Sequence, residues 1–270
     1  MSAIGVFDSG VGGLTVVRAL LERLPHEAIL YLGDTARVPY GNKSAETVRR
    51  YAANAARFLL ARDVKALLVA CNTASAYAID TLAALPVPVL GAVEPGARAA
   101  VHASRSGVIG VVGTLGTVRS GAYVRAIDRA ALAAGRTVRV AARPCPLLVP
   151  LVEEGWLDGE VPTLVARRYL DELHAEAPDL DVIVLGCTHY PLLRPLLARI
   201  TSERWGHPVT LVDSATTMAE ETATLLTARG LTAIGGEGSL RCAVTDDARF
   251  DEIGARFLGR SLGELERVDL

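Results

Sequence analysis

Short apolar runs rich in β-branched residues alternate along this chain with longer segments in which apolar residues recur at helical spacing. Such alternation is typical of βα units, in which helices connect parallel strands and cover the sheet. The sequence therefore predicts an α/β fold with mostly parallel sheets. The expected strands are Ile4–Phe7, Ala28–Leu32, Ala66–Ala70, Val87–Leu90, Val108–Val112, Val138–Ala141, Val182–Leu185, Thr210–Val212 and Leu240–Thr245.

The segments between these runs predict helices with recognisable ends. Ser44 is expected to cap a helix that extends to about Arg62, and Glu46 lies where the positive end of the helix dipole favours an acidic residue. Gly230 suits the end of a later helix, because glycine readily adopts the left-handed conformation found there. The other expected helices are Leu14–Leu24, Ala74–Ala84, Val118–Ala133, Val161–Ala175 and Ala215–Arg229.

Two interruptions of this pattern predict two α/β lobes. Residues 87–95 contain two prolines and a glycine just before a new series of βα units, and residues 205–208 contain a second break. An acidic residue and a serine then follow a strand, as they do after the first strand, which predicts a return to the first lobe. We therefore expect residues 1–92 and 206–270 to form the first lobe, and residues 93–205 to form the second.

Composition favours a cytoplasmic enzyme. With 270 residues, 50% of them hydrophobic, the chain is long enough to bury a substantial core. A net charge of −2 and a pI near 6.2 give no electrostatic footprint for nucleic acid or for a membrane surface. The start of the chain lacks a secretory signal pattern, and no apolar run has membrane-spanning length. Four cysteines without a CxxC pair indicate free thiols in a reducing compartment.

A cysteine motif occurs once in each half of the chain, directly after an apolar run. The first copy places Cys71 after residues 67–70, and the second places Cys187 after residues 182–186. Each thiol thus lies at the carboxyl end of a predicted strand, where open α/β sheets form active sites. Two thiols on opposite sides of a substrate can invert a stereocentre, because one removes a proton while the other delivers one to the opposite face.

Two other interpretations of the cysteines stay open. A lone cysteine is usually a small buried apolar residue, but the recurrence of the motif favours catalysis for this pair. A thiol redox switch is the second alternative, and it requires Cys71 and Cys187 to come within disulfide distance. Cys145 and Cys242 are expected to be structural. No metal is expected, because the histidines outside the motif form no ligand cluster; they are His26, His102, His174 and His207.

Polar residues after the first two strands are further candidates for a site. The glycine-rich turn of residues 7–14 matches neither GxGxxG nor the P-loop, and Asp8 would repel phosphate. Asp8 instead suits a substrate ammonium group or a thiol that needs electrostatic steering, with helix capping as the structural alternative. In the loop of residues 33–42, Tyr40 offers a ring wall and Gly41 lets a backbone amide approach a carboxylate, unless this loop is an ordinary turn.

Six segments, in order along the chain, closely resemble the glutamate racemases of the cofactor-independent aspartate/glutamate racemase superfamily. Each alone is a weak signal, whereas six in order with two cysteine motifs are highly specific. The segments are Asp8–Leu14, Pro39–Gly41, Ala70–Ser75, Gly113–Thr117, Pro150–Gly155 and Gly186–Pro191.

This resemblance implies an enzyme that interconverts L- and D-glutamate with no pyridoxal phosphate, no other cofactor and no metal. It implies an active site in the cleft between two similar α/β lobes, and a homodimer. D-Glutamate from such enzymes supplies bacterial peptidoglycan. Some similar enzymes carry an N-terminal extension linked to activation by a peptidoglycan precursor; seven residues before Asp8 argue against that regulation here.

The resemblance also assigns roles to individual residues. Cys71 resembles the base that deprotonates D-glutamate, and Cys187 the base that deprotonates L-glutamate. Asp8 and His189 would assist these thiols respectively, and Glu153 would support His189. The residues expected to hold the substrate are Asp8, Ser9, Tyr40, Gly41, Asn72, Thr73, Thr188 and His189, with Thr114 and Thr117 as weaker candidates.

General chemistry supports these assignments independently. A cysteine base at neutral pH needs its thiolate favoured by a cation, a helix N-terminus or hydrogen-bond donors, and a helix is expected after each cysteine. Without a cofactor to take up electrons, the site needs donors at the substrate carboxylate. Asn72, Thr73 and Thr188 are placed to supply them.

Other functions within reach of the same sequence remain alternatives. Aspartate racemase, or a related hydantoin or maleate enzyme, would share the thiol pair and differ in the length of its substrate. A second, non-enzymatic role in binding DNA gyrase rests on analogy with some similar proteins.

Overall fold

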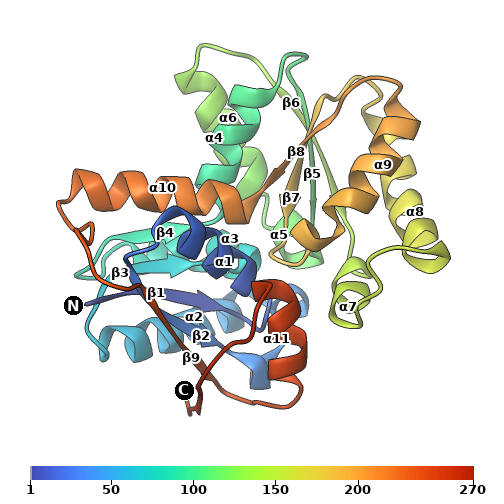
Figure 1. Ribbon diagram of the computed structural model, residues 1–270. Helices are drawn as coiled ribbons and strands as arrows, with labels where there is room; N and C mark the ends of the chain where they lie inside the picture. Colours follow the sequence, from blue (N-terminus) through green and yellow to red (C-terminus); the bar gives the residue numbers. More distant parts are fainter. Residues whose placement is uncertain (1) are drawn as a thin grey trace. The chain divides into compact units, whose positions relative to one another are not determined.

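The computed structural model describes residues 2–270, and the chain divides into two compact units. The first unit contains the residues up to Ala92 together with Ala215–Leu270, and the second is Val93–Ser214. Each unit has its own parallel sheet with helices packed on it (Figure 1). The chain is thus α/β, as the alternation of apolar runs predicts.

The sheet of the first unit has six strands in the order β10-β9-β2-β1-β3-β4, and every pairing is parallel. The central strand β1 is buried along its whole length, which explains why its sequence is a continuous apolar run. The strands are β1 (Ala3–Asp8), β2 (Ala28–Gly33), β3 (Val64–Val69), β4 (Val89–Gly91), β9 (Ser239–Val244) and β10 (Leu265–Arg267).

Helices α2 and α3 pack side by side and share a core with alternate residues of the strands, such as Phe7, Leu32 and Val69. The Ser44 side chain accepts a hydrogen bond from Thr47 N and caps α2 as predicted. The helices of this unit are α1 (Leu14–Arg23), α2 (Ala45–Leu60), α3 (Asn72–Leu82), α10 (Ser214–Ala228) and α11 (Phe250–Leu258), with short 3-10 turns η1 (Thr35–Arg37) and η2 (Tyr40–Asn42).

The sheet of the second unit has four parallel strands in the order β6-β5-β7-β8. The strands are β5 (Val108–Gly113), β6 (Arg139–Pro144), β7 (Val182–Gly186) and β8 (Thr210–Asp213). The helices are α4 (Val93–Ala103), α5 (Leu115–Arg119), α6 (Ala122–Ala133), α7 (Leu148–Glu153), α8 (Glu160–Glu176) and α9 (Arg194–Trp205), with a 3-10 turn η3 (Tyr190–Leu193).

The expected return to the first lobe at residue 206 is wrong by one strand. β8 pairs with β7, so residues 206–213 belong to the second unit. The break at Gly206 only ends α9, because this glycine adopts a left-handed conformation with φ of 65°. The chain leaves the second unit where α10 begins, at Ser214.

Other differences from the expected elements have local causes. The single helix predicted over residues 118–133 is two helices, α5 and α6, because Gly121 between them has φ of 64°. The three-residue strand β10 carries two charged side chains and has no apolar run to predict it. Helices α4, α7, α9 and α11 were not predicted, whereas each expected strand overlaps an observed one.

Candidate active site

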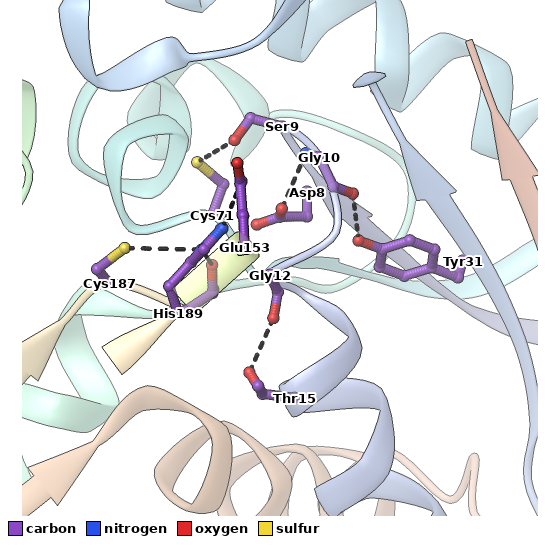
Figure 2. Close-up of polar contacts among 11 residues, drawn as sticks. Asp8, Ser9, Gly10, Gly12, Thr15, Tyr31, Cys71, Glu153, Cys187 and His189 are labelled. Carbon is purple, nitrogen blue, oxygen red and sulfur yellow. Dashed lines mark hydrogen bonds and ion pairs between the residues drawn. The ribbon is translucent and has the colours of Figure 1, made fainter. Parts of the chain in front are cut away.

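Cys71 lies directly after β3 and caps α3 at the carboxyl edge of the first sheet. Its sulfur accepts a hydrogen bond from Ala74 N at 3.5 Å and is hydrogen bonded to Ser9 Oγ at 3.4 Å (Figure 2). The residue is 6% exposed. The thiol donates to the Ser9 hydroxyl, and the Ala74 amide at the N-terminus of α3 donates to the sulfur. A helix N-terminus beside a cysteine favours the thiolate.

Asp8 ends the neighbouring strand β1, and the glycine-rich turn that follows packs tightly around it. The buried carboxylate accepts a hydrogen bond from Gly10 N at 2.9 Å, and Tyr31 Oη donates to Gly10 O at 2.7 Å. A Cβ atom at Gly13 would lie 2.5 Å from Asp8 Cβ and 3.1 Å from the Tyr31 ring. Glycine is required at this position because the start of α1 approaches β1 so closely.

Cys187 follows β7 at the carboxyl edge of the second sheet. A histidine lies next to its sulfur, and a carboxylate lies next to that histidine. Its sulfur lies 3.9 Å from His189 Nδ1, and His189 Nε2 lies 2.8 Å from Glu153 Oε1 (Figure 2). Glu153 comes from the last turn of α7, so the two segments meet at the imidazole. Cys187 is 5% exposed.

The environment of His189 favours its protonated form. Burial lowers the pKa of His189, but hydrogen bonds to Cys187 and Glu153 and the negative charge of both groups outweigh it and raise the pKa from 6.5 to about 10. At neutral pH the imidazole is therefore a cation beside the sulfur. A positive charge is thus placed 3.9 Å from the Cys187 sulfur.

The other predicted substrate contacts fall near one cysteine or the other. Asn72 and Thr73 form the first turn of α3 after Cys71, and both are buried. Thr188 is buried, and its hydroxyl lies 3.4 Å from His189 Nδ1.

Thr114 and Thr117, the weaker candidates, lie after β5. The Thr114 hydroxyl caps α5 by accepting a hydrogen bond from Thr117 N, and the two hydroxyls are 3.0 Å apart.

Tyr40 and Gly41 lie in η2, which packs against α3. Tyr40 is buried in the same core cluster as Cys71. Its hydroxyl donates a hydrogen bond to Asp34, a buried residue for which the sequence predicted no role. The signal that pointed to Asp8, an acidic residue directly after a buried strand, is also present at Asp34.

The predicted site residues therefore form two groups, one in each compact unit. The group around Cys71 contains Asp8, Ser9, Tyr40, Gly41, Asn72 and Thr73. The group around Cys187 contains Glu153, Thr188 and His189, with Thr114 directly after the neighbouring strand β5 and Thr117 in α5.

Comparisons with known proteins identify the family of this chain. The family model for Asp/Glu/Hydantoin racemase matches residues 4–222. The chain belongs to this racemase family. Racemases are isomerases, so the chain is an enzyme of that class. It is 54% identical over 272 residues to a glutamate racemase of Syntrophus aciditrophicus, with 99% of this chain and 96% of the relative aligned. It is 48% identical over 271 residues to one of Neisseria gonorrhoeae, at 99% and 96% coverage.

Solved structures of glutamate racemases have a similar fold. The glutamate racemase of Thermus thermophilus in complex with β-chloro-D-alanine has a TM-score of 0.88 and 46% identity to this racemase, covering 100% of this chain and 97% of that one. The glutamate racemase of Francisella tularensis in complex with D-glutamate has a TM-score of 0.90 and 36% identity, at 99% and 97% coverage.

Cys145 and Cys242 have surroundings that differ from those of the site cysteines. Both are buried, and burial raises the pKa of Cys145 strongly and that of Cys242 to about 12. These two groups stay neutral thiols over the physiological range. Within residues 2–270, no group of three or more histidine, cysteine and acidic side chains is arranged to hold a metal ion. No helix of the described chain is both long and apolar enough to cross a membrane.

The contact between Glu153 and His189 makes a testable prediction about pH. Because the pKa of His189 is raised in the folded protein, its positive charge stabilises the fold. This stabilisation is fully present below about pH 6.5 and is lost as the pH rises through about 10. Glu153→Gln removes one of the two anionic partners and should lower the imidazole pKa. Histidine ring NMR of the racemase at a series of pH values measures this shift.

Glu160→Gln provides the control, because Glu160 is an exposed carboxylate at the start of α8. It should leave the titration of His189 unchanged. Identical titrations in the Glu153→Gln variant and the parent would show that the carboxylate does not hold the proton on His189.

Proposed function

We propose that this racemase interconverts L- and D-glutamate by proton transfer between Cys71 and Cys187. The observation that carries the proposal is the pair of buried cysteines, each at the carboxyl end of a parallel strand and each with its own polar partners. Proton removal from one face of Cα and delivery to the other requires two such groups. Glutamate as the substrate is supported by full-length relatives named glutamate racemases at 43% to 54% identity.

In the direction from L-glutamate, Cys187 is the base. The protonated imidazole of His189 lies beside the sulfur and compensates its negative charge before the reaction. When the thiolate takes the Cα proton, the charge on sulfur disappears, and Glu153 keeps the imidazole oriented. Cys71, protonated at this stage, delivers its proton to the opposite face. The reverse reaction starts with the Cys71 thiolate, which the amide of Ala74 stabilises.

The carbanionic state is the difficult point of this reaction, because no cofactor takes up its electrons. Donors fixed in advance at the α-carboxylate supply the largest stabilisation in such a case. We assign this role to Asn72, Thr73 and Thr188, together with the backbone amide of Gly41. Asp8, buried at the end of β1, would pair with the substrate ammonium group and assist Cys71.

The physiological setting follows from the same proposal. The enzyme would act in the cytoplasm as a homodimer, without cofactor or metal. The D-glutamate that it makes would be used in peptidoglycan synthesis. Aspartate is the alternative substrate. An aspartate racemase homologue from Pyrococcus horikoshii has 17% identity and a TM-score of 0.59, a likeness of fold alone. The higher identity to enzymes named for glutamate therefore favours the longer substrate.

The choice of substrate can be tested directly. Purified protein is incubated separately with L-glutamate and L-aspartate, and the products are separated by chiral chromatography. We expect D-glutamate to accumulate until both enantiomers are equal, with much slower turnover of L-aspartate. Faster racemisation of aspartate than of glutamate would contradict the assigned substrate and leave the thiol chemistry standing.

The two-thiol mechanism predicts that Cys71→Ala and Cys187→Ala each abolish racemisation in both directions, because a site with one base cannot reprotonate the opposite face. Far-UV circular dichroism should stay native. Cys242→Ala is the matched control, since Cys242 is a buried thiol on β9 that stays neutral. It should retain activity. Substantial racemisation by either Cys71→Ala or Cys187→Ala would contradict the mechanism.

A further inference from the structure

Asp34 is a fully buried carboxylate, with 0% exposure, at the carboxyl end of β2. Three side chains donate hydrogen bonds to it. Arg37 Nε lies 2.9 Å from Oδ1 and 2.7 Å from Oδ2, Thr245 Oγ1 lies 3.1 Å from Oδ1, and the Tyr40 hydroxyl donates to Oδ2. A buried carboxylate is tolerated only when paired and hydrogen bonded, so Asp34 and its donors hold one another in place.

These contacts tie the loop of residues 35–42 to the end of β9. Next to the carboxylate, Ala36 N donates to Thr245 Oγ1 at 2.9 Å, and Asp246 N donates to Thr35 Oγ1 at 2.7 Å. The Arg37 guanidinium also stacks on the Tyr51 ring, with 4.3 Å to the ring centroid. The loop is thus fixed around Asp34 at residues 35–37 and at Tyr40, and Tyr40, next to Gly41, is buried in the core cluster that contains Cys71.

The hydrogen bond to Asp34 also limits what Tyr40 can do. A phenol has one proton, and Tyr40 donates it to Asp34. Burial and the charge of Asp34 raise the pKa of Tyr40 far above its ordinary value, so the group stays neutral. Tyr40 therefore neither donates a hydrogen bond to the substrate nor supplies a proton. Its ring packs against Phe7 and Tyr51 and anchors the adjacent Gly41.

We propose that Asp34 is a positioning residue of the racemase: through Tyr40 and Arg37 it holds the main chain at Gly41 in the conformation that receives the substrate carboxylate. The inference rests on the proposed function and adds a residue that touches neither substrate nor reacting atoms. Asp34 would lower the free-energy cost of substrate binding, because it orders the loop in advance. A loop fixed before binding spares the substrate the cost of ordering it.

The same strand supplies a matched control at its other end. Glu27 directly precedes β2, is 2% exposed, pairs with Lys65 Nζ at 2.5 Å and accepts a hydrogen bond from Ala233 N at 2.8 Å. Glu27 and Asp34 are thus both buried, paired carboxylates that hold loops in the first unit. Glu27 lies at the amino end of the sheet, away from the strand ends that carry Asp8 and Cys71.

A positioning role for Asp34 predicts a change in KM that is larger than the change in kcat. L- and D-glutamate have equal free energy, so kcat/KM must be equal in the two directions for every variant, and the information lies in how the loss divides between kcat and KM. Asp34→Asn turns one acceptor oxygen into a donor that faces Arg37 Nε or another donor, which loosens the loop. We expect KM to rise about tenfold for both enantiomers, equivalent to about 1.4 kcal/mol, with a smaller change in kcat.

The experiment measures kcat and KM in both directions for Asp34→Asn, Tyr40→Phe, the double variant and Glu27→Gln, below their unfolding temperatures. Tyr40→Phe removes one of the donors and should raise KM by less than Asp34→Asn does. The double variant should show less than the product of the two effects, because both act through one contact. Glu27→Gln should lower the unfolding temperature and leave KM unchanged.

Unchanged KM in Asp34→Asn would overturn the proposal, as would an equal rise in Glu27→Gln, which would mean that any loss of stability has this effect. If Asp34→Asn does not fold, Tyr40→Phe decides alone: a raised KM supports the role, and an unchanged KM overturns it. A parent enzyme that does not racemise glutamate would contradict the proposed function itself. An active parent with unaffected variants would contradict only the role of Asp34.

Discussion

The parallel pairing of β1 with β2 and β3 is the constraint on which the first half of the site depends. Parallel strands end at the same edge of a sheet, so this pairing brings together residues from three distant segments: Asp8, Asp34 and Cys71. The second sheet repeats the arrangement, with Thr114 and Cys187 after the paired strands β5 and β7. An antiparallel sheet would send neighbouring strand ends to opposite edges.

Burial then gives these side chains their chemical character. Each site cysteine is almost completely buried, yet it has polar partners: a helix amide that donates to the sulfur and a serine hydroxyl at Cys71, and the charged His189 at Cys187. Cys145 and Cys242 are buried as well, and for them desolvation dominates and keeps the thiol neutral. Under the proposed mechanism, the same residue type is therefore a base in one setting and a packing element in the other, because the neighbouring groups differ.

The sequence predicted the strands well, because fully buried parallel strands are continuous apolar runs with few competing interpretations. It was less informative where a local break has two possible meanings. Gly206 marks a helix end and was interpreted as a crossover, because only the pairing of β8 with β7 decides between them. Six motifs in order led to the racemase family. Asp34 was missed although it follows a buried strand as Asp8 does, because the sequence does not show that Tyr40, Arg37 and the distant Thr245 all donate to its carboxylate.

The central proposal, proton transfer by two thiols with separate protons, is tested most directly by the fate of hydrogen at Cα. L-Glutamate is converted in deuterated water, and both enantiomers are analysed at early times by mass spectrometry after chiral separation. We expect D-glutamate to carry deuterium from its first appearance, because Cys71 has already exchanged with solvent, while the remaining L-glutamate is labelled more slowly. Early D-glutamate that retains the original hydrogen would instead mean that one base serves both faces, and would contradict the account.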